Sequence, residues 1–339
     1  MGRMDERRWY RPHWLRRHPW LAGALLAGLL FAGLNLLAWQ HARALLVFEN
    51  GGARTPPPAS LSRWQKLQVL VRGPRIPKPA NRRTPRDLGL AFETHTISLD
   101  GGVELEVWCC PRRDAAGVVV LFHGFSAAKS SVLGEARAFH DMGFQTVLAD
   151  FRGSGGSNGR STSIGYHEAG DVAAVVGFVR GRMPEGPLIL YGQSMGSAAV
   201  LRSMQTAEVR PDAVVLESVF DRLLTTVGNR FEQMGVPSFP SAQLLVFWGG
   251  VQVGFSGFEH NPAEYAKGCR CPALMLHGAG DLNARPAEAR AVYRNLCGPK
   301  HFEELAGAGH SGLYAADPER WRQAVEQFLI EQGLMPVGR

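Results

Sequence analysis

From residue 90 onward, short apolar runs alternate with segments of helix length. The runs of strand length fall near residues 93–99, 103–109, 118–122, 145–149, 187–191, 213–217, 273–277 and 300–305. Helices are expected near residues 130–142, 165–182, 195–206, 285–297 and 318–332. Such alternation is typical of parallel βαβ units, in which helices cover both faces of one sheet. We expect the first two strands to form an antiparallel hairpin at the sheet edge, joined at Asp100-Gly101-Gly102. The sequence therefore predicts an α/β domain with a mostly parallel sheet over residues 91–335.

One strand-to-helix junction carries the motif G-x-S-x-G. The residues are Gly192-Gln193-Ser194-Met195-Gly196, after the apolar run 187–191 and before the helix-favouring run 197–205. In this setting the motif predicts a sharp turn that holds the serine hydroxyl out, and the small flanking residues let strand and helix pack closely. A serine hydroxyl is a poor nucleophile unless a base lies beside it and N–H groups can hold an oxyanion. Ser194 is the candidate nucleophile.

A serine on such a turn needs an acid and then a histidine, in that chain order. Asp281 follows the apolar run 273–276 at the end of the segment His277-Gly278-Ala279-Gly280-Asp281. His310 lies in the glycine-rich loop 306–312 that follows the last expected strand. We expect His310 to act as general base and Asp281 to fix its tautomer.

Other acids and histidines in the sequence are alternatives to these two. Glu217 and Asp221 flank the end of the strand 213–217 and are the alternative acids, with Glu217 favoured as a loop-fixing residue. Asp317 follows His310 and is out of order. His123 and His277 each precede a glycine at a strand end, and we expect both to order their loops rather than to transfer protons.

The oxyanion needs two backbone donors near the nucleophile. One is the N–H of the residue after the serine, Met195, and the other comes from the loop after an earlier strand. That loop begins His123-Gly124-Phe125-Ser126, and Gly124 allows the close backbone approach that the N–H of Phe125 would need.

Taken in order, these motifs resemble the α/β-hydrolase superfamily. The motifs are His123-Gly124, the segment Asp-Phe-Arg-Gly-Ser-Gly-Gly-Ser at 150–157, the 192–196 turn, His277-Gly278-x-x-Asp281 and Gly309-His310. The pattern is most similar to the serine-aminopeptidase-like and monoglyceride-lipase-like group, which includes membrane-anchored members, and it covers about residues 90–332. The resemblance implies that Ser194, Asp281 and His310 form the triad, with Phe125 and Met195 as oxyanion donors. It also implies that residues 150–157 shape the site wall without taking part in the chemistry.

The alternation lapses between residues 221 and 270, where this group keeps a cap. The stretch is rich in large apolar residues: Phe231, Met234, Phe239, Leu244, Leu245, Phe247, Trp248, Phe255 and Phe258. We expect most of them to pack a small helical cap onto the body and the rest to line an acyl-chain pocket.

The N-terminus predicts a membrane span. Residues 20–39 contain no charge and one polar side chain, Asn35, which suffices to cross a bilayer core of about 30 Å. The basic tail 1–19 holds six arginines against two acidic residues, so we expect the tail in the cytoplasm and the catalytic domain outside. Two alternatives stay open: a signal peptide cleaved after Ala42-Arg43-Ala44, and a buried core helix.

Residues 40–90 are rich in proline and arginine, which predicts a semi-rigid basic connector. This basic run contributes to the net charge of +7, and its positive charge favours contact with anionic lipid headgroups. No nucleic-acid-binding module accompanies it, so nucleic acid is not an expected partner. Of the five cysteines, Cys269-Arg270-Cys271 is too short for a C-x-x-C motif. We expect all five to be structural, with no metal and no organic cofactor.

Together these features predict a single-pass, membrane-anchored serine hydrolase that cleaves lipid-like or amphiphilic esters through an acyl-enzyme. The alternative within enzymes is an aminopeptidase or amidase, which would need a carboxylate near the site to bind a substrate amine. A non-catalytic binding protein is the less favoured alternative.

Overall fold

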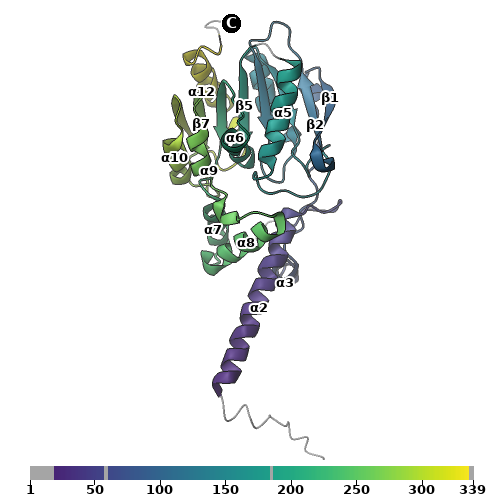
Figure 1. Ribbon diagram of the computed structural model, residues 1–339, viewed down its shortest axis with the longest axis vertical. Coiled ribbons are helices and arrows are strands. Elements are labelled where there is room, and N and C mark those ends of the chain that lie inside the picture. The colour runs from purple at the N-terminus through teal and green to yellow at the C-terminus, as the bar shows by residue number, and fades with distance from the viewer. Residues whose placement is uncertain (1–18, 57–59, 184–185, 336–339) are drawn as a thin grey trace, which may run out of the picture.

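A computed structural model of the chain describes residues 19–56, 60–183 and 186–335, and Figure 1 shows their arrangement. Within these residues, eight strands form one sheet in the order β1-β2-β4-β3-β5-β6-β7-β8. The strands are β1 Glu93–Ser98, β2 Glu104–Cys110, β3 Val118–Phe122, β4 Gln145–Ala149, β5 Leu188–Gln193, β6 Ala213–Glu217, β7 Ala273–Gly278 and β8 Lys300–Leu305. β1, β2 and β4 pair antiparallel, and all the other pairs are parallel. The predicted mostly parallel sheet with an antiparallel edge hairpin is confirmed.

Helices cover both faces of the sheet. The longer ones around it are α4 Leu133–Asp141, α5 Glu168–Arg182, α6 Met195–Thr206, α10 Pro286–Asn295 and α12 Pro318–Glu331. One apolar core joins the sheet to α5, α6 and α10, and a second joins its other face to α4 and α12. β3, β5 and β6 are buried along their whole length, because helices pack on them from both sides.

Shorter elements complete the domain. They are the helices α9 Pro262–Tyr265 and α11 Leu313–Ala316 and the 3-10 turns η2 Pro85–Leu88, η3 Asp100–Gly102, η4 Lys129–Val132, η5 Gly257–Glu259 and η6 Ala266–Gly268.

Between β6 and β7 the chain leaves the sheet and forms a helical cap. It consists mainly of α7 Leu223–Gln233 and α8 Ser238–Val253, which pack on each other. A small apolar cluster joins the cap to the body, with Leu223 and Val246 from the cap against Ala198 and Phe220. In Figure 1 the cap lies below the sheet and beside the long N-terminal helix.

That N-terminal helix is α2, Pro19–Leu46, and it extends beyond the predicted span 20–39. Its apolar part, Trp20–Leu46, has 27 residues, and its most apolar 18-residue window has a mean hydropathy of 2.1, so length and composition suit a membrane anchor or a signal sequence. None of its most apolar window is buried in the protein, which rules out a core helix. The arginine-rich residues 1–18, on which the predicted orientation depends, lie outside the described residues.

The segment after α2 runs along the domain before it reaches the sheet. Val47 forms a β-bridge with Ser161, and Glu49 forms one with Pro77. Phe48 is buried, and its ring lies 6.3 Å from the ring of Phe125. The segment also contains the short helix α3, Arg63–Arg72, which begins at a capping box formed by Ser62 and Gln65.

Candidate active site

The turn between β5 and α6 has the strained geometry that the G-x-S-x-G motif predicts. Ser194 has φ 51° and ψ −107°, and its N–H donates to the carbonyl of Glu217 on the neighbouring strand at 2.7 Å. A Cβ on Gly192 would lie 2.6 Å from the nitrogen of Ser197, and one on Gly196 would lie 2.4 Å from the carbonyl oxygen of Phe122. Only glycine fits at these two positions, so the turn can hold the serine hydroxyl at the carboxyl end of the sheet.

The structure brings Ser194, His310 and Asp281 together in one hydrogen-bonded chain. Ser194 Oγ lies 3.0 Å from His310 Nε2, and His310 Nδ1 lies 2.8 Å from Asp281 Oδ2. Since the Asp281 carboxylate can only accept, Nδ1–H donates to it and Nε2 is left to accept from the hydroxyl. The side chain of Asp281 is fully buried, whereas that of His310 is 15% exposed. The His310 ring therefore lies between the serine hydroxyl and the buried carboxylate and is partly exposed to solvent.

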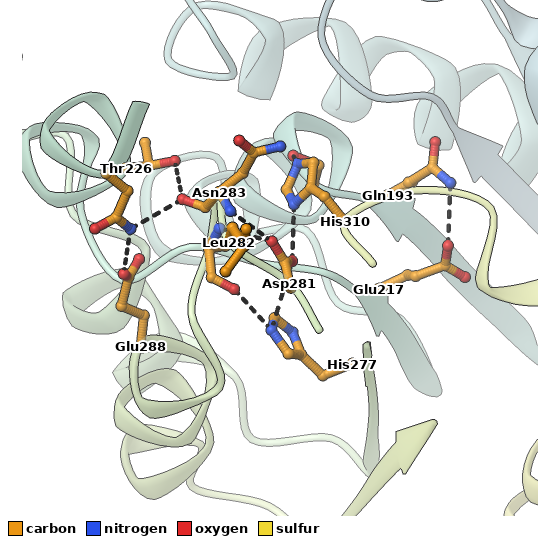
Figure 2. A network of polar contacts seen from close by, with 12 residues as sticks. Gln193, Glu217, Thr226, His277, Asp281, Leu282, Asn283, Glu288 and His310 are labelled. Atoms are coloured by element: carbon orange, nitrogen blue, oxygen red, sulfur yellow. Dashed lines mark hydrogen bonds and ion pairs between the residues drawn. The ribbon is translucent and has the colours of Figure 1, made fainter. Parts of the chain in front are cut away.

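Neighbouring groups fix the Asp281 carboxylate. Its Oδ1 accepts from the N–H groups of Asn283 at 2.8 Å and Ala284 at 2.9 Å. His277 donates from Nε2 to the carbonyl of Ala284 at 2.8 Å, and burial lowers the pKa of His277, so its ring is neutral. His277 thus orders the loop that carries the carboxylate (Figure 2).

The cap also holds this loop, a role that the sequence did not predict. From α7, Thr226 Oγ1 and Asn229 Nδ2 donate to the carbonyl of Asn283 at 2.8 and 3.0 Å, and Gln233 donates to the carbonyl of Leu282 at 2.8 Å. Asn229 also donates to Glu288, whose pKa burial raises to about 7. Figure 2 shows this network beside Asp281. Polar residues at 226, 229 and 233 share one helix face, and this spacing is the feature of the sequence that indicates a polar contact of the cap helix.

The two alternative acids have other partners. Glu217 is fully buried beneath the turn, where Tyr191, Gln193 and Trp321 donate to its carboxyl group at 2.8, 3.0 and 3.2 Å. Burial raises the pKa of Glu217 despite these donors. Asp221 accepts from the N–H of Arg222 at 2.6 Å. The carboxylate that bonds to His310 is that of Asp281.

The loop after β3 lies against the Ser194 turn. A Cβ on Gly124 would be 3.5 Å from the carbonyl of Gln193 and 3.7 Å from Ser194 Cβ. In the described part of the chain, neither the N–H of Phe125 nor that of Met195 donates a hydrogen bond to another protein group. Met195 is the first residue of α6, and the first N–H groups of a helix have no acceptor within that helix.

His123 orders the start of the same loop. Its Nδ1 donates to the carbonyl of Gly124 at 2.8 Å, and its Nε2 accepts from the N–H of Phe151 at 3.2 Å. Burial lowers the pKa of His123, so the ring is neutral.

A buried ion pair fixes the far end of this loop. The Lys129 ammonium contacts both Asp150 and Glu106, and the N–H of Lys129 donates to Asp150 Oδ1 at 2.7 Å. Although burial opposes its charge, the nearby Lys129 ammonium holds the pKa of Asp150 below its usual value. Asn81 and the N–H of Gly156 also donate to Asp150 Oδ2. The segment 150–157 is therefore held to the loop that carries Phe125.

The five cysteines are free thiols. Cys109 and Cys110 lie in β2, and burial raises their pKa values to about 12 and about 11. Cys269 Sγ and Cys271 Sγ lie 3.9 Å apart, and Cys297 is exposed.

The sheet order, the strained serine turn and the hydrogen-bonded chain at its carboxyl end are those of an α/β hydrolase. Comparisons with known proteins agree. Residues 113–236 match a family model described as serine aminopeptidase, S33. The solved structure of the Pyrococcus furiosus esterase Pf2001 covers 75% of this chain with 98% of its own, at a TM-score of 0.61 and 19% identity.

Two relatives extend the likeness. The Bacillus subtilis protein YqkD is 22% identical over 231 residues, which are 67% of this chain and 76% of that one. The human protein ABHD12B is 27% identical over 240 residues, or 59% of this chain and 64% of that one. The resemblance to the α/β-hydrolase superfamily that the motifs predicted is thus confirmed, and the comparisons support a hydrolase.

Proposed function

We propose that this protein is a serine hydrolase that cleaves carboxylic esters through an acyl-enzyme. The observation that carries the proposal is the chain from Ser194 Oγ through His310 to Asp281, with distances of 3.0 and 2.8 Å, on a strained turn. Residues at hydrogen-bonding distance in this order can activate a hydroxyl, because the histidine takes its proton as the carbonyl is attacked.

The mechanism follows from these positions. Ser194 Oγ attacks the ester carbonyl carbon while His310 Nε2 accepts the hydroxyl proton, and Asp281 stabilises the resulting imidazolium. The N–H groups of Phe125 and Met195 hold the oxyanion of the tetrahedral intermediate. When the intermediate collapses, the ester C–O bond breaks and His310 gives its proton to the departing alcohol. Water then attacks the acyl-enzyme by the same steps, which releases the acid and restores Ser194.

Ester substrates are favoured over peptides by the surroundings of the serine. An aminopeptidase needs a free carboxylate to bind the substrate amine, and the two carboxylates nearest the end of β6 are engaged, Glu217 by three donors and Asp221 by Arg222. The Pyrococcus furiosus protein with a similar structure is named an esterase, whereas the matching family model is described as a serine aminopeptidase. The peptidase is therefore the second candidate.

We further propose that α2 anchors the enzyme in a membrane, with the catalytic domain outside the cytoplasm, and that the substrates are lipid-like or amphiphilic. The support is the exposed apolar length of α2 and the apolar composition of α8, which lies against it. The proposed serine mechanism needs neither a metal nor an organic cofactor.

Two measurements test the proposal. A fluorophosphonate probe should label the wild-type protein and not Ser194→Ala. Hydrolysis of p-nitrophenyl esters of graded acyl length should then exceed hydrolysis of aminoacyl anilides. Labelling of Ser194→Ala at the wild-type rate would overturn the serine assignment, and faster cleavage of anilides would support the peptidase instead.

A further inference from the structure

Large apolar side chains on the cap and on α3 point away from the protein. On α3, Trp64 is 76% exposed, and in the cap Phe239 is 74% exposed. We call the full set the apolar rim: Trp64, Leu67, Leu70, Val71, Met234, Phe239, Phe247 and Val251, all exposed. Exposed apolar side chains that lie together on a protein surface mark a site of contact with a membrane or another protein.

The composition of α3 is that of a helix at a membrane surface. In the described structure none of its residues is buried, so packing against the domain does not account for it. Trp64, Leu67 and Val71 recur on one face, and the remaining positions include Arg63, Lys66 and Arg72. A short helix with tryptophan on its apolar face and basic residues around it suits the interface of an anionic leaflet.

The cap helix α8 is joined to the proposed anchor. Trp248 Nε1 donates to Asn35 Oδ1 at 3.0 Å, and Gln252 Nε2 donates to the carbonyl of Trp39 at 2.9 Å. Asn35 precedes Trp39 by four residues, or about 6 Å along the helix axis. The contact therefore reaches into the last part of the apolar span, where a bilayer surface would lie.

The helix α3 reaches the same end of α2. His41 Nε2 donates to the carbonyl of Leu70 at 2.8 Å, and a Cβ on Gly73 would lie 2.6 Å from Ala44 Cβ. Figure 1 shows α3 and α8 beside the C-terminal half of α2, with α7 next to α8, between the sheet and the free half of α2. A bilayer that encloses the free half would thus meet the apolar rim.

We infer that the apolar rim docks into the headgroup region of the leaflet that α2 enters, so that the cap lies in the membrane surface. The inference rests on the proposed membrane anchoring and deepens the proposed function. A lipid ester in that leaflet reaches the cap without crossing water, because the cap itself is immersed. The rim residues and the basic residues of α3 supply the apolar and electrostatic parts of this contact.

Spin labelling of the full chain in vesicles of phosphatidylcholine and phosphatidylglycerol tests the docking without reference to catalysis. Nitroxides are placed at Leu67→Cys and Phe247→Cys in a Cys271→Ser, Cys297→Ser background. A label at Leu29→Cys reports insertion of α2, and one at Gln323→Cys on the exposed face of α12 reports water. We expect collisions with oxygen, relative to a water-soluble nickel chelate, to be several-fold higher at the rim labels than at Gln323→Cys.

Each other result contradicts the inference in a distinguishable way. Water-like rim labels with a lipid-exposed label at Leu29→Cys would overturn docking but keep the anchor. A water-exposed label at Leu29→Cys would overturn both. Strong dipolar coupling between rim labels of different chains, with low oxygen accessibility, would show that a second copy covers the rim instead.

Activity measurements provide a second readout. We expect Leu67→Gln with Phe247→Gln to lower hydrolysis of a long-chain ester presented in vesicles by roughly tenfold. Hydrolysis of a short, soluble p-nitrophenyl ester should stay unchanged. Ile330→Gln on α12, remote from the cap, is the matched control and should change neither rate. An equal fall in both rates for the rim variant would contradict docking, since it would locate the defect in the fold or the chemistry.

Discussion

Asn229 of the cap donates a hydrogen bond to the carbonyl of Asn283 at 3.0 Å, and so ties α7 to the loop in which Asp281 is held. The two residues are 54 positions apart in the chain. The N–H of Asn283 in turn donates to the Asp281 carboxylate. A movement of the cap would therefore displace Asn283 and, with it, the proposed acid.

Asn229→Ala is therefore expected to lower kcat for a short ester by about tenfold, since small displacements of a reacting group cost large factors in rate. The loop keeps its bonds to Thr226 and His277, so the loss should stay below that of removing the acid. Thr225→Val on the same helix is the control. A variant that is less thermostable but has an unchanged kcat would assign Asn229 to the fold alone.

Asp281→Asn is expected to lower kcat by on the order of a thousandfold or more, because the tautomer of His310 is no longer fixed. Asp221→Asn should have little effect, since its carboxylate accepts from Arg222. Steady-state hydrolysis of a p-nitrophenyl ester compares the two. If Asp221→Asn were the more damaging change, the acid would belong to the end of β6.

Glu135 and Glu217 give the fold a dependence on pH. Burial raises the pKa of Glu135 to about 8, and the carboxylate of Glu217 adds to the shift. The folded state then binds this proton more tightly than the unfolded state, so the stability it contributes is present at low pH and is lost as the pH rises towards 8.

Glu135→Gln should consequently gain stability relative to wild type between pH 5 and pH 8, by a few kcal/mol in the free energy of unfolding. Urea unfolding of the detergent-solubilised chain at the two pH values measures this difference. Glu319→Gln, exposed on α12, is the control. A difference that is the same at both pH values would contradict the prediction.

A chain that begins at residue 47 is expected to hydrolyse soluble esters, whereas one that begins at residue 53 should be less stable and less active. The first retains the buried Phe48, whose ring lies 6.3 Å from that of Phe125. Removal of a buried phenylalanine costs about 3 kcal/mol or more. The unfolding temperature and kcat of the two chains test this prediction. Equal values for both chains would show that Phe48 contributes neither to stability nor to activity.

The topology predicted from the arginine-rich tail can be tested in intact spheroplasts. Added protease should digest the catalytic domain if α2 stays uncleaved with its N-terminus in the cytoplasm. Protection of the domain would reverse the orientation. A mature N-terminus at Leu45 would instead identify α2 as a cleaved signal sequence, and neither result bears on the ester chemistry.

Local patterns accounted for the sheet and for the residues that meet at its carboxyl end. Ser194 and Asp281 each follow an apolar run, His310 follows the mixed run 300–305, and parallel strands bring such loops to one edge. The alternation of residue types also placed every strand within one or two residues of its observed bounds.

Contacts between distant segments could not be predicted in this way. Thr226 and Asn229 donate to a backbone carbonyl. Every residue has such a carbonyl, so the residue type at the accepting position does not indicate the bond. Phe48 lies in a stretch whose composition predicts a linker, and its contact with Phe125 joins segments far apart in the sequence. The join between Trp248 and Asn35 spans 213 positions, and neither residue type indicates it alone.

The bond between Asn35 and Trp248 gives the proposed anchor a required rotation about its own axis as well as a length. Successive residues of a helix are rotated by about 100°. One residue inserted into α2 between Asn35 and Ala42 would turn Asn35 away from α8, while the buried side chains of Ala42 and Leu46 stayed in place. A foreign apolar helix of equal hydropathy would insert into the membrane equally well, yet it would hold the enzyme only as a tether, free to swivel above the bilayer.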